Sequence, residues 1–232
     1  SKWDLGVIIL VGLLARLFFI CLNPPFEDDY YRYFFDGFLM LTEGTPYESP
    51  PMAWFGQSLS TFDTFVLDHL TYPEFKTIYG PVVELFFTLI TWLKIQTVSL
   101  LKAVYLVIDL GVYAFFIKKL SKQQQILYLW NPLILFEVFI SAHFDLLLMV
   151  GCFFMIRFFD HNKKYGLAVV LGLLGSIRIY TILFWPFLLK GNKKLSLISI
   201  ISFLLPYVFF KKFWLQNNIT NLIAIMDKWE YN

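Results

Sequence analysis

The chain has 232 residues, of which 58% are hydrophobic and 16% are charged, and its mean hydropathy is +0.64. A soluble domain usually carries about 25% charged and about 45–50% apolar residues, so the composition excludes an ordinary soluble domain. The net charge of +2 is too small to indicate a nucleic-acid partner.

Several stretches approach the length of about 20 apolar residues that a membrane-spanning helix needs. All but the last of them contain one or two ionisable residues, which usually face a bundle interior or a water-filled cavity. We therefore predict an all-α fold, a polytopic transmembrane helical bundle. The predicted spans are 5–22, 79–93, 100–117, 126–142, 144–159, 165–189 and 195–210, and 213–226 is ambiguous.

Residues 23–78 are too polar to span a membrane and form a large first loop, in which aromatic and charged residues alternate as in interfacial helices. Residues 23–80 hold nine of the 17 acids of the chain, and their only strong bases are Arg32 and Lys76. Short Lys-rich loops tend to stay cytoplasmic, so we expect the acidic loop on the extracytoplasmic side. The Lys clusters lie elsewhere: Lys118/Lys119/Lys122, Lys163/Lys164, Lys190/Lys193/Lys194 and Lys211/Lys212.

The Lys pattern also constrains the topology. If the loops at 118–122 and 163–164 are both cytoplasmic, the hairpin between them turns at residues 141–145, on the side of the acidic loop. This requires an odd number of crossings between residues 79 and 117, where two apolar segments lie. One of these two segments must then be a partial or interfacial helix.

Residues 27–33 (EDDYYRY), directly after the first predicted span, form the sharpest local motif. Adjacent carboxylates can supply a general base or bind a cation, although residue types alone favour a solvated loop start. No other His or Cys lies near His143 and Asp145, which argues against a zinc site. Cys21 and Cys152 lie in apolar stretches and are predicted to be buried free thiols.

Arg178 lies deep in an apolar run that Pro186 could break. A buried arginine needs an anionic partner, and the sequence leaves open whether this partner is an acid of the membrane bundle or a phosphate group.

Two stretches of the first loop resemble the GT-C superfamily, polytopic glycosyltransferases that use polyprenyl-phosphate sugars. Residues 28–37 (DDYYRYFFDG), followed by 44–47 (GTPY), resemble the first external loop of this family and are most similar to bacterial mannosyltransferase-like members. Residues 72–81 (YPEFKTIYGP) resemble the family's His-Pro-Glu…Tyr-Pro-Pro stretch before the next helix.

The resemblance continues in the same order along the chain. Residues 130–137 (WNPLILFE) and 143–145 (HFD) resemble the family's Asn-Pro…Glu…Gly-His-x-Asp stretch. Arg178 stands where such proteins often place Lys, and residues 229–232 (WEYN) resemble a later Trp-x-Phe-Asn stretch, beyond which family members continue. We therefore interpret 1–232 as a single GT-C-like transmembrane domain that lacks C-terminal helices.

Gly80, Ala142 and Arg178 depart from the family's Pro, Gly and Lys, which leaves the sugar and the acceptor open.

The resemblance implies an inverting transfer of a mannose-like hexose from a polyprenyl-phosphate sugar to a hydroxyl of a glycan or lipid acceptor. It places the active site at the extracytoplasmic face of a bacterial inner or plasma membrane. Asp29 is the implied base, with Asp28 in reserve. Arg178 and Arg32 are implied to hold the phosphate, and Tyr79, Glu137, His143 and Asp145 to line the pocket. No metal ligand or cofactor is assigned, and a divalent cation is left open.

Two other classes compete with this interpretation. A transporter or lipid flippase would line its substrate path with the same buried charges, but transporters tend to show duplicated halves, which this sequence lacks. A non-catalytic membrane subunit is the third alternative.

Overall fold

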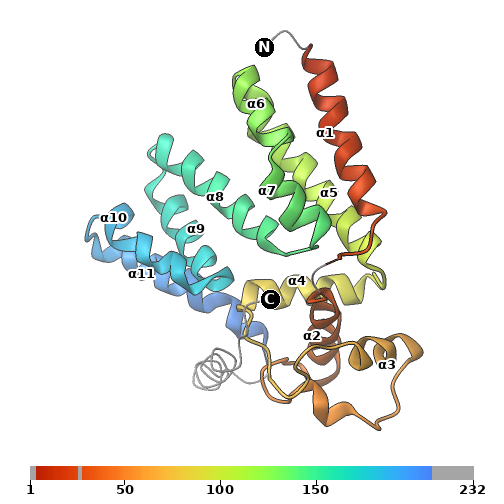
Figure 1. The fold of residues 1–232 in the computed structure, drawn as a ribbon. Helices are drawn as coiled ribbons and strands as arrows, with labels where there is room; N and C mark the ends of the chain where they lie inside the picture. The colour runs from red at the N-terminus through yellow and green to blue at the C-terminus, as the bar shows by residue number, and fades with distance from the viewer. Residues whose placement is uncertain (1–3, 26–27, 211–232) are drawn as a thin grey trace.

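The computed structural model describes residues 4–25 and 28–210, and within them helices are the only regular secondary structure. This confirms the all-α class (Figure 1). Glu27, the ambiguous stretch 213–226 and the motif at 229–232 lie outside the described residues. The helices are α1 Leu5–Ile20, α2 Tyr30–Glu43, η1 Pro51–Trp54, α3 Thr61–Asp68, α4 Pro81–Trp92, α5 Val98–Phe115, η2 Ile117–Lys119, α6 Lys122–Leu129, α7 Pro132–Ile134, η3 Leu135–Ile140, α8 Asp145–Asp160, α9 Lys164–Ile177, η4 Ile179–Phe184, α10 Trp185–Leu189, α11 Lys193–Leu204 and η5 Leu205–Phe209.

Among the described residues, one helix is long and apolar enough to cross a membrane, the 22-residue stretch Val98–Lys119. α1, α4, α9 and the stretch Ile179–Leu189 are apolar but shorter. The helix lengths thus support the predicted span at 100–117, and the polytopic bundle stays a prediction.

The prediction of a span at 79–93 is wrong in length, because α4 contains 12 residues. It lies crosswise between α1, α5 and α8 above and α2 and α3 below (Figure 1). At about 1.5 Å per residue, a helix of this length reaches about 18 Å, well short of the hydrocarbon thickness. Pro81 starts the helix at its first position. Lys94, in a left-handed conformation with φ 56°, follows its end.

The single span predicted at 165–189 is also wrong, because the chain reverses at Arg178. α9 ends at Ile177 and Arg178 is extended. The returning segment η4–α10 then brings Leu189 against Leu167. Pro186 lies in the first turn of α10 and does not cause the break.

The predicted span 126–142 is interrupted as well. α6 ends at Leu129, and Asn131 caps a new turn by accepting a hydrogen bond from the backbone N–H of Leu133 at 2.9 Å. Pro132 cannot donate a backbone hydrogen bond to the preceding turn, so the helix restarts there. The restarted segment continues as the π-helix η3.

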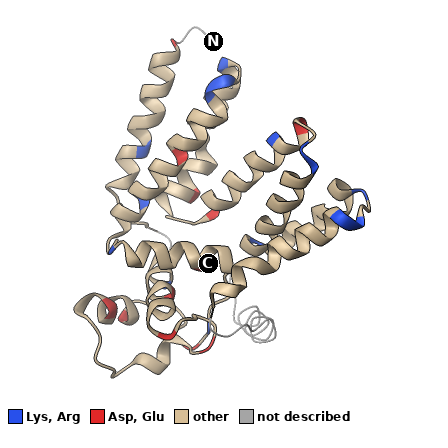
Figure 2. Cartoon of the chain, turned by 180° about the vertical axis from the view of Figure 1, so that it is seen from behind, with Lys and Arg blue, Asp and Glu red and all other residues tan. Residues whose placement is uncertain are grey.

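The Lys-bearing turns and the acidic first loop lie at opposite ends of the molecule (Figure 2). Three of the four Lys clusters occupy the turns between α5 and α6, α8 and α9, and α10 and α11, and Lys211 and Lys212 lie outside the described residues. The acids of the first loop lie in the layer formed by α2 and α3, below α4 (Figures 1 and 2). The turn 141–144 points away from the Lys-bearing turns, because α8 separates it from Lys163.

Four of the ionisable residues in apolar stretches are fully buried, as predicted. Arg16 on α1 donates from Nε to Asp109 Oδ2 on α5 at 2.7 Å, and Tyr128 donates to the other Asp109 oxygen at 2.6 Å. Lys102 donates to the carbonyl of Leu22 at 2.8 Å, just beyond the end of α1. These contacts compensate the buried charges and join the first helix to the bundle. The fourth is Glu84, on α4.

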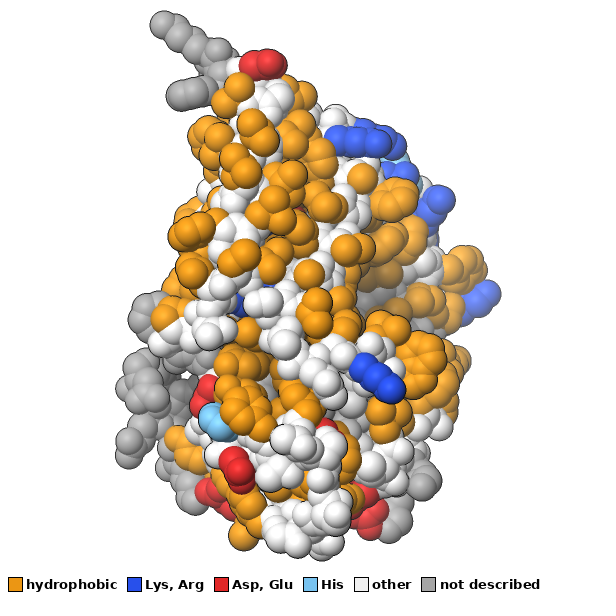
Figure 3. All heavy atoms as spheres, turned by 90° about the vertical axis from the view of Figure 1, so that its right-hand side faces the viewer, with side chains coloured by type: hydrophobic (Ala, Val, Ile, Leu, Met, Phe, Trp, Pro, Cys, Tyr) orange, Lys and Arg blue, Asp and Glu red, His pale blue; other side chains and the backbone are white. Residues whose placement is uncertain are grey.

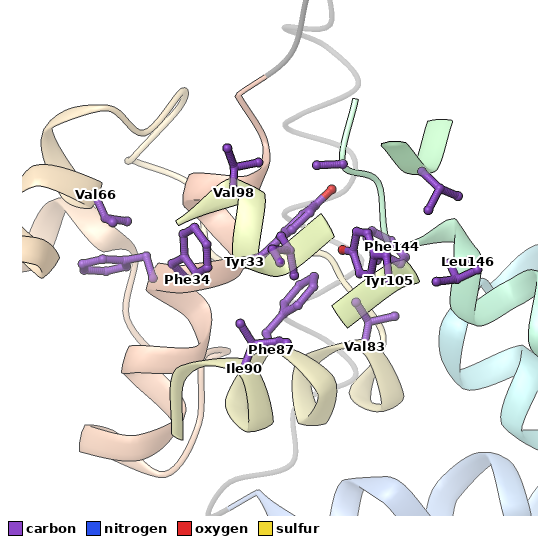
Figure 4. Packing of buried hydrophobic residues seen from close by; sticks show 14 of the residues in the cluster. Tyr33, Phe34, Val66, Val83, Phe87, Ile90, Val98, Tyr105, Phe144 and Leu146 are labelled. Carbon is purple, nitrogen blue, oxygen red and sulfur yellow. The ribbon is translucent and has the colours of Figure 1, made fainter. Parts of the chain in front are cut away.

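The largest core cluster lies where α2 packs on α4 (Figure 4). The rings of Tyr33 and Phe87 stack at a centroid distance of 4.4 Å. Gly37 permits this approach, because a Cβ there would lie 2.5 Å from the carbonyl oxygen of Phe87. The first loop therefore packs against the crosswise α4 through its helix α2.

Candidate active site

Three aromatic side chains bring together segments that are far apart in the sequence. The ring centroids of Tyr33 on α2, Tyr79 before α4 and Phe144 before α8 lie 5.1–5.7 Å from one another, all in edge-to-face geometry. The guanidinium of Arg178 lies over the Phe144 ring, 4.5 Å from its centroid. We call Tyr33, Tyr79 and Phe144 the aromatic triad; Figure 4 shows Tyr33 and Phe144 in this cluster.

The predicted base Asp29 is exposed and occupies the position before the first turn of α2. The side chain of Asp29 makes no cap hydrogen bond to the helix. Burial raises the pKa of the Tyr33 phenol well above its ordinary value, and the charges of Tyr79, Asp29, Tyr105 and Asp145 raise it further. The charges of Asp29 and Asp145 thus both act on the Tyr33 phenol.

Asp28, the predicted reserve, is engaged differently. Its Oδ2 accepts a hydrogen bond from the hydroxyl of Thr71 at 2.7 Å at the surface. This bond ties the start of α2 to the loop after α3, which gives Asp28 a local structural partner.

Arg178 pairs with an acid of the bundle, Asp145. Nε and Nη2 donate to Oδ1 at 3.2 and 3.0 Å, and Nη2 also donates to Oδ2 at 2.9 Å. Both side chains are about one-third exposed. No described residue accepts a hydrogen bond from Nη1, so this edge of the guanidinium is available to a further anion.

The side chain of Arg32 is hydrogen-bonded to other groups of the protein. Its Nε donates to Asp36 Oδ1 at 2.8 Å and its Nη1 donates to the carbonyl of Phe75 at 2.9 Å. Its Nη2 is buried without a described partner. With a side chain only 11% exposed, Arg32 orients the start of α2.

Glu137 and His143 form a second pair at the turn. The Nδ1 of His143 lies 2.6 Å from Glu137 Oε2, and the backbone N–H of His143 donates to the Glu137 carbonyl at 2.8 Å. Glu137 lies in the π-helix η3, a distortion that is frequent at functional sites. Ala142 has φ 62°, which explains why glycine suits this position in the family.

The backbone of Tyr79 is fixed from both sides. Its N–H donates to the hydroxyl of Thr77 at 3.2 Å, and its carbonyl accepts a hydrogen bond from the Tyr47 hydroxyl at 3.0 Å. The sequence did not single out Thr77 or Tyr47, and it gave Tyr33 and Phe144 no role of their own. The one available signal was that each lies in a motif stretch.

The described cavities lie elsewhere. One of about 400 Å³ is lined by residues such as Phe158, Leu188 and Lys190, at the Lys-bearing end. None of its lining residues is an acid, so its chemistry does not match the aromatic triad and its carboxylates. Among the described residues, no group of three or more His, Cys, Asp or Glu side chains could hold a metal ion.

Carboxylates and a partly exposed arginine beside aromatic rings are groups that can act as a general base and bind an anionic substrate. Residues 13–190 match the model of the MptA_B family, described as the alpha-(1->6)-mannopyranosyltransferase N-terminal domain. The match covers more than half of the chain, and the chain belongs to this family. The match supports the predicted mannosyltransferase, while the GT-C type and the polyprenyl-phosphate donor stay predictions. Comparisons with curated proteins and with solved structures gave no match.

Proposed function

We propose that the chain carries the active site for inverting transfer of mannose from a polyprenyl-phosphate donor to an acceptor hydroxyl. The observation that carries the proposal is the grouping of Asp29, the aromatic triad and the Asp145–Arg178 pair from four separate segments. Such a transfer needs a base for the acceptor hydroxyl and a cation for the leaving phosphate, and Asp29 and Arg178 supply these two groups near the aromatic triad.

The base step falls to Asp29. Its carboxylate takes the proton of the acceptor hydroxyl while the hydroxyl oxygen forms a bond to the anomeric carbon of the donor. The bond from that carbon to the phosphate oxygen breaks at the same time, and its electron pair leaves with the lipid phosphate. A positioned base contributes about 10²–10⁴-fold to such a reaction.

The leaving phosphate gains negative charge, and Arg178 is the cation placed to meet it. Asp145 holds Nε and Nη2 and thereby directs Nη1 outward. The Phe144 face, 4.5 Å from the guanidinium carbon, adds a cation–π contact that restricts its motion. A preorganised cation of this kind stabilises developing charge more than it stabilises the ground state.

The distribution of side chains supports a membrane setting with the site on the extracytoplasmic face. On the face seen in Figure 3, apolar side chains cover the upper part, and acids gather in the lower part. Leu10, Leu14 and Phe18 are 54–61% exposed on α1. If the Lys-bearing turns are cytoplasmic, the crosswise α4 serves as the interfacial segment between residues 79 and 117 that the topology requires.

The purified protein, incubated with a panel of polyprenyl-phosphate sugars and mannoside acceptors, tests the proposal. We expect release of the lipid phosphate with the mannose donor, in amounts equal to the mannoside formed and with inversion at the anomeric carbon. The proposal would be refuted if no donor in the panel released lipid phosphate, or if Asp29→Asn and Asp28→Asn both kept wild-type release.

A further inference from the structure

Beneath the aromatic triad lie two carboxyl groups that the proposed reaction does not use. Asp36 on α2 and Glu84 on α4 are both 0% exposed. Their side chains lie close enough to one another for a hydrogen bond if one of them carries a proton. Two carboxylates cannot hydrogen-bond to each other, because neither has a proton to donate.

The charges around the pair do not balance if both groups are ionised. Among the described residues, Arg32 is the one cation that pairs with either carboxyl group, and it does so through Asp36 Oδ1. Tyr47 and Tyr79, the other titratable groups that face the pair, are neutral phenols. Two buried carboxylates beside one guanidinium would leave an uncompensated negative charge, which proteins usually avoid by taking up a proton.

The oxygen atoms show where this proton belongs. Glu84 Oε1 accepts a hydrogen bond from the Thr77 hydroxyl at 2.5 Å, as a carbonyl oxygen would. Glu84 Oε2 and Asp36 Oδ2 are the buried oxygens left without a partner when both groups are treated as acceptors. A hydroxyl at Glu84 Oε2 that donates to Asp36 Oδ2 satisfies both atoms. Burial raises the pKa of Asp36 against the lowering effect of Arg32, as expected of a carboxyl that competes for this proton.

We propose that Asp36 and Glu84 share one proton and, through Thr77, act as a positioning pair for Tyr79 in the proposed transferase site. The Thr77 hydroxyl has a single proton, which it gives to Glu84, and it therefore faces Tyr79 as an acceptor for the backbone N–H. The Tyr79 ring then packs edge-on against Phe144, which carries Arg178 on its face. The shared proton thus fixes the position of Tyr79 within the aromatic triad, next to the residues proposed as base and cation.

Infrared spectroscopy of the whole protein, in a detergent that lacks carbonyl groups, tests the shared proton without any substrate. At neutral pH we expect a carbonyl band of a protonated carboxyl group that is lost in Glu84→Gln and retained in Asp68→Asn, the control at an exposed carboxyl on α3. Glu84→Gln should keep its melting temperature, because an amide can donate to Asp36 and accept from Thr77 as the neutral acid does. Identical spectra for wild type and Glu84→Gln would overturn the shared proton.

The positioning role rests on the proposed function and is tested by turnover. Thr77→Val removes the acceptor for the Tyr79 N–H and should lower kcat about tenfold or more, whereas Thr77→Ser should restore it. A Thr77→Val protein with wild-type kcat would overturn the positioning role. A wild-type protein that transfers no sugar would refute the proposed function alone, since the infrared band is measured without substrate.

Discussion

At the scale of single residues, Asp29 and Asp28 are neighbours with different surroundings. Asp28 is hydrogen-bonded to Thr71 at the surface, whereas the charge of Asp29 acts on the buried Tyr33. The sequence could favour Asp29 over Asp28 as the base only by its position in a motif. Local sequence does not show which of the two carboxyl groups lies near a buried aromatic ring. The structure supplies that distinction.

We expect Asp29→Asn to reduce turnover by at least about 10²-fold, with donor binding and melting temperature near those of wild type. Asparagine keeps the shape of the side chain and removes the proton acceptor. Turnover and donor binding measured in one preparation give the answer. Asp28→Asn is the matched control and should retain most activity. An inactive Asp28→Asn beside an active Asp29→Asn would assign the base to Asp28.

Arg178 gives a second prediction at this scale. Arg178→Met should weaken donor binding strongly and lower the free energy of unfolding by at most about 1 kcal/mol, because partly exposed ion pairs contribute little. Arg178→Lys, the residue common in the family, should recover part of the binding. Equilibrium binding of the donor and thermal melting separate the two effects. A destabilised Arg178→Met protein with unchanged donor affinity would show that the pair with Asp145 is purely structural.

At the scale of elements, the sequence predicted where apolar segments lie but not where they break. The reversal at Arg178 interrupts a run of apolar residues whose composition is uniform on both sides. Its cause is a partner 33 positions away, Asp145, together with the indole of Trp185, which donates to the carbonyl of Leu171 at 3.2 Å. Hydropathy within one segment contains no information about such long-range contacts.

The contact between the start of α4 and the end of α9 is the tightest of these element contacts. A Cβ on Gly80 would lie 1.9 Å from the carbonyl oxygen of Ser176, so any side chain there must push the two helices apart. A proline in place of Gly80 would therefore be incompatible with this packing. Gly80 connects Tyr79 of the aromatic triad to α4, and Ser176, which it contacts, lies two positions before Arg178 in the sequence.

Gly80→Ala should lower the free energy of unfolding by about 1–3 kcal/mol through overpacking and reduce turnover as well, because Tyr79 and Arg178 would separate. Chemical denaturation measures the first effect and sugar transfer the second. Gly111→Ala on α5 is the control: no atom lies within 4 Å of its Cβ, and alanine favours the helix interior by up to about 1 kcal/mol. Equal stability of the two variants would contradict the close approach.

At the scale of the whole molecule, the positions of charged residues were the most informative part of the sequence. The separation of Lys clusters from the acidic loop required a partial helix between residues 79 and 117, and α4 has the length and the crosswise placement of one. The grouping of the motif stretches around one aromatic triad was implied by their common family. Their relative distances could not be predicted, because they depend on how α2, α4 and α8 pack.

The sidedness of the molecule can be tested directly with single cysteines in a variant that lacks Cys21 and Cys152. Cysteines placed at Ser58, in the first loop, and at His143, in the turn before α8, should react with a membrane-impermeant thiol reagent added from the extracytoplasmic side. A cysteine at Lys163, exposed in the turn between α8 and α9, should react only after the membrane is opened. The expectation rests on the opposite placement of acidic and basic residues (Figure 2) and on the tendency of Lys-rich turns to remain cytoplasmic. Labelling of positions 58 and 143 from opposite sides would separate Asp29 from the Asp145–Arg178 pair by the bilayer, and the proposed site could not form.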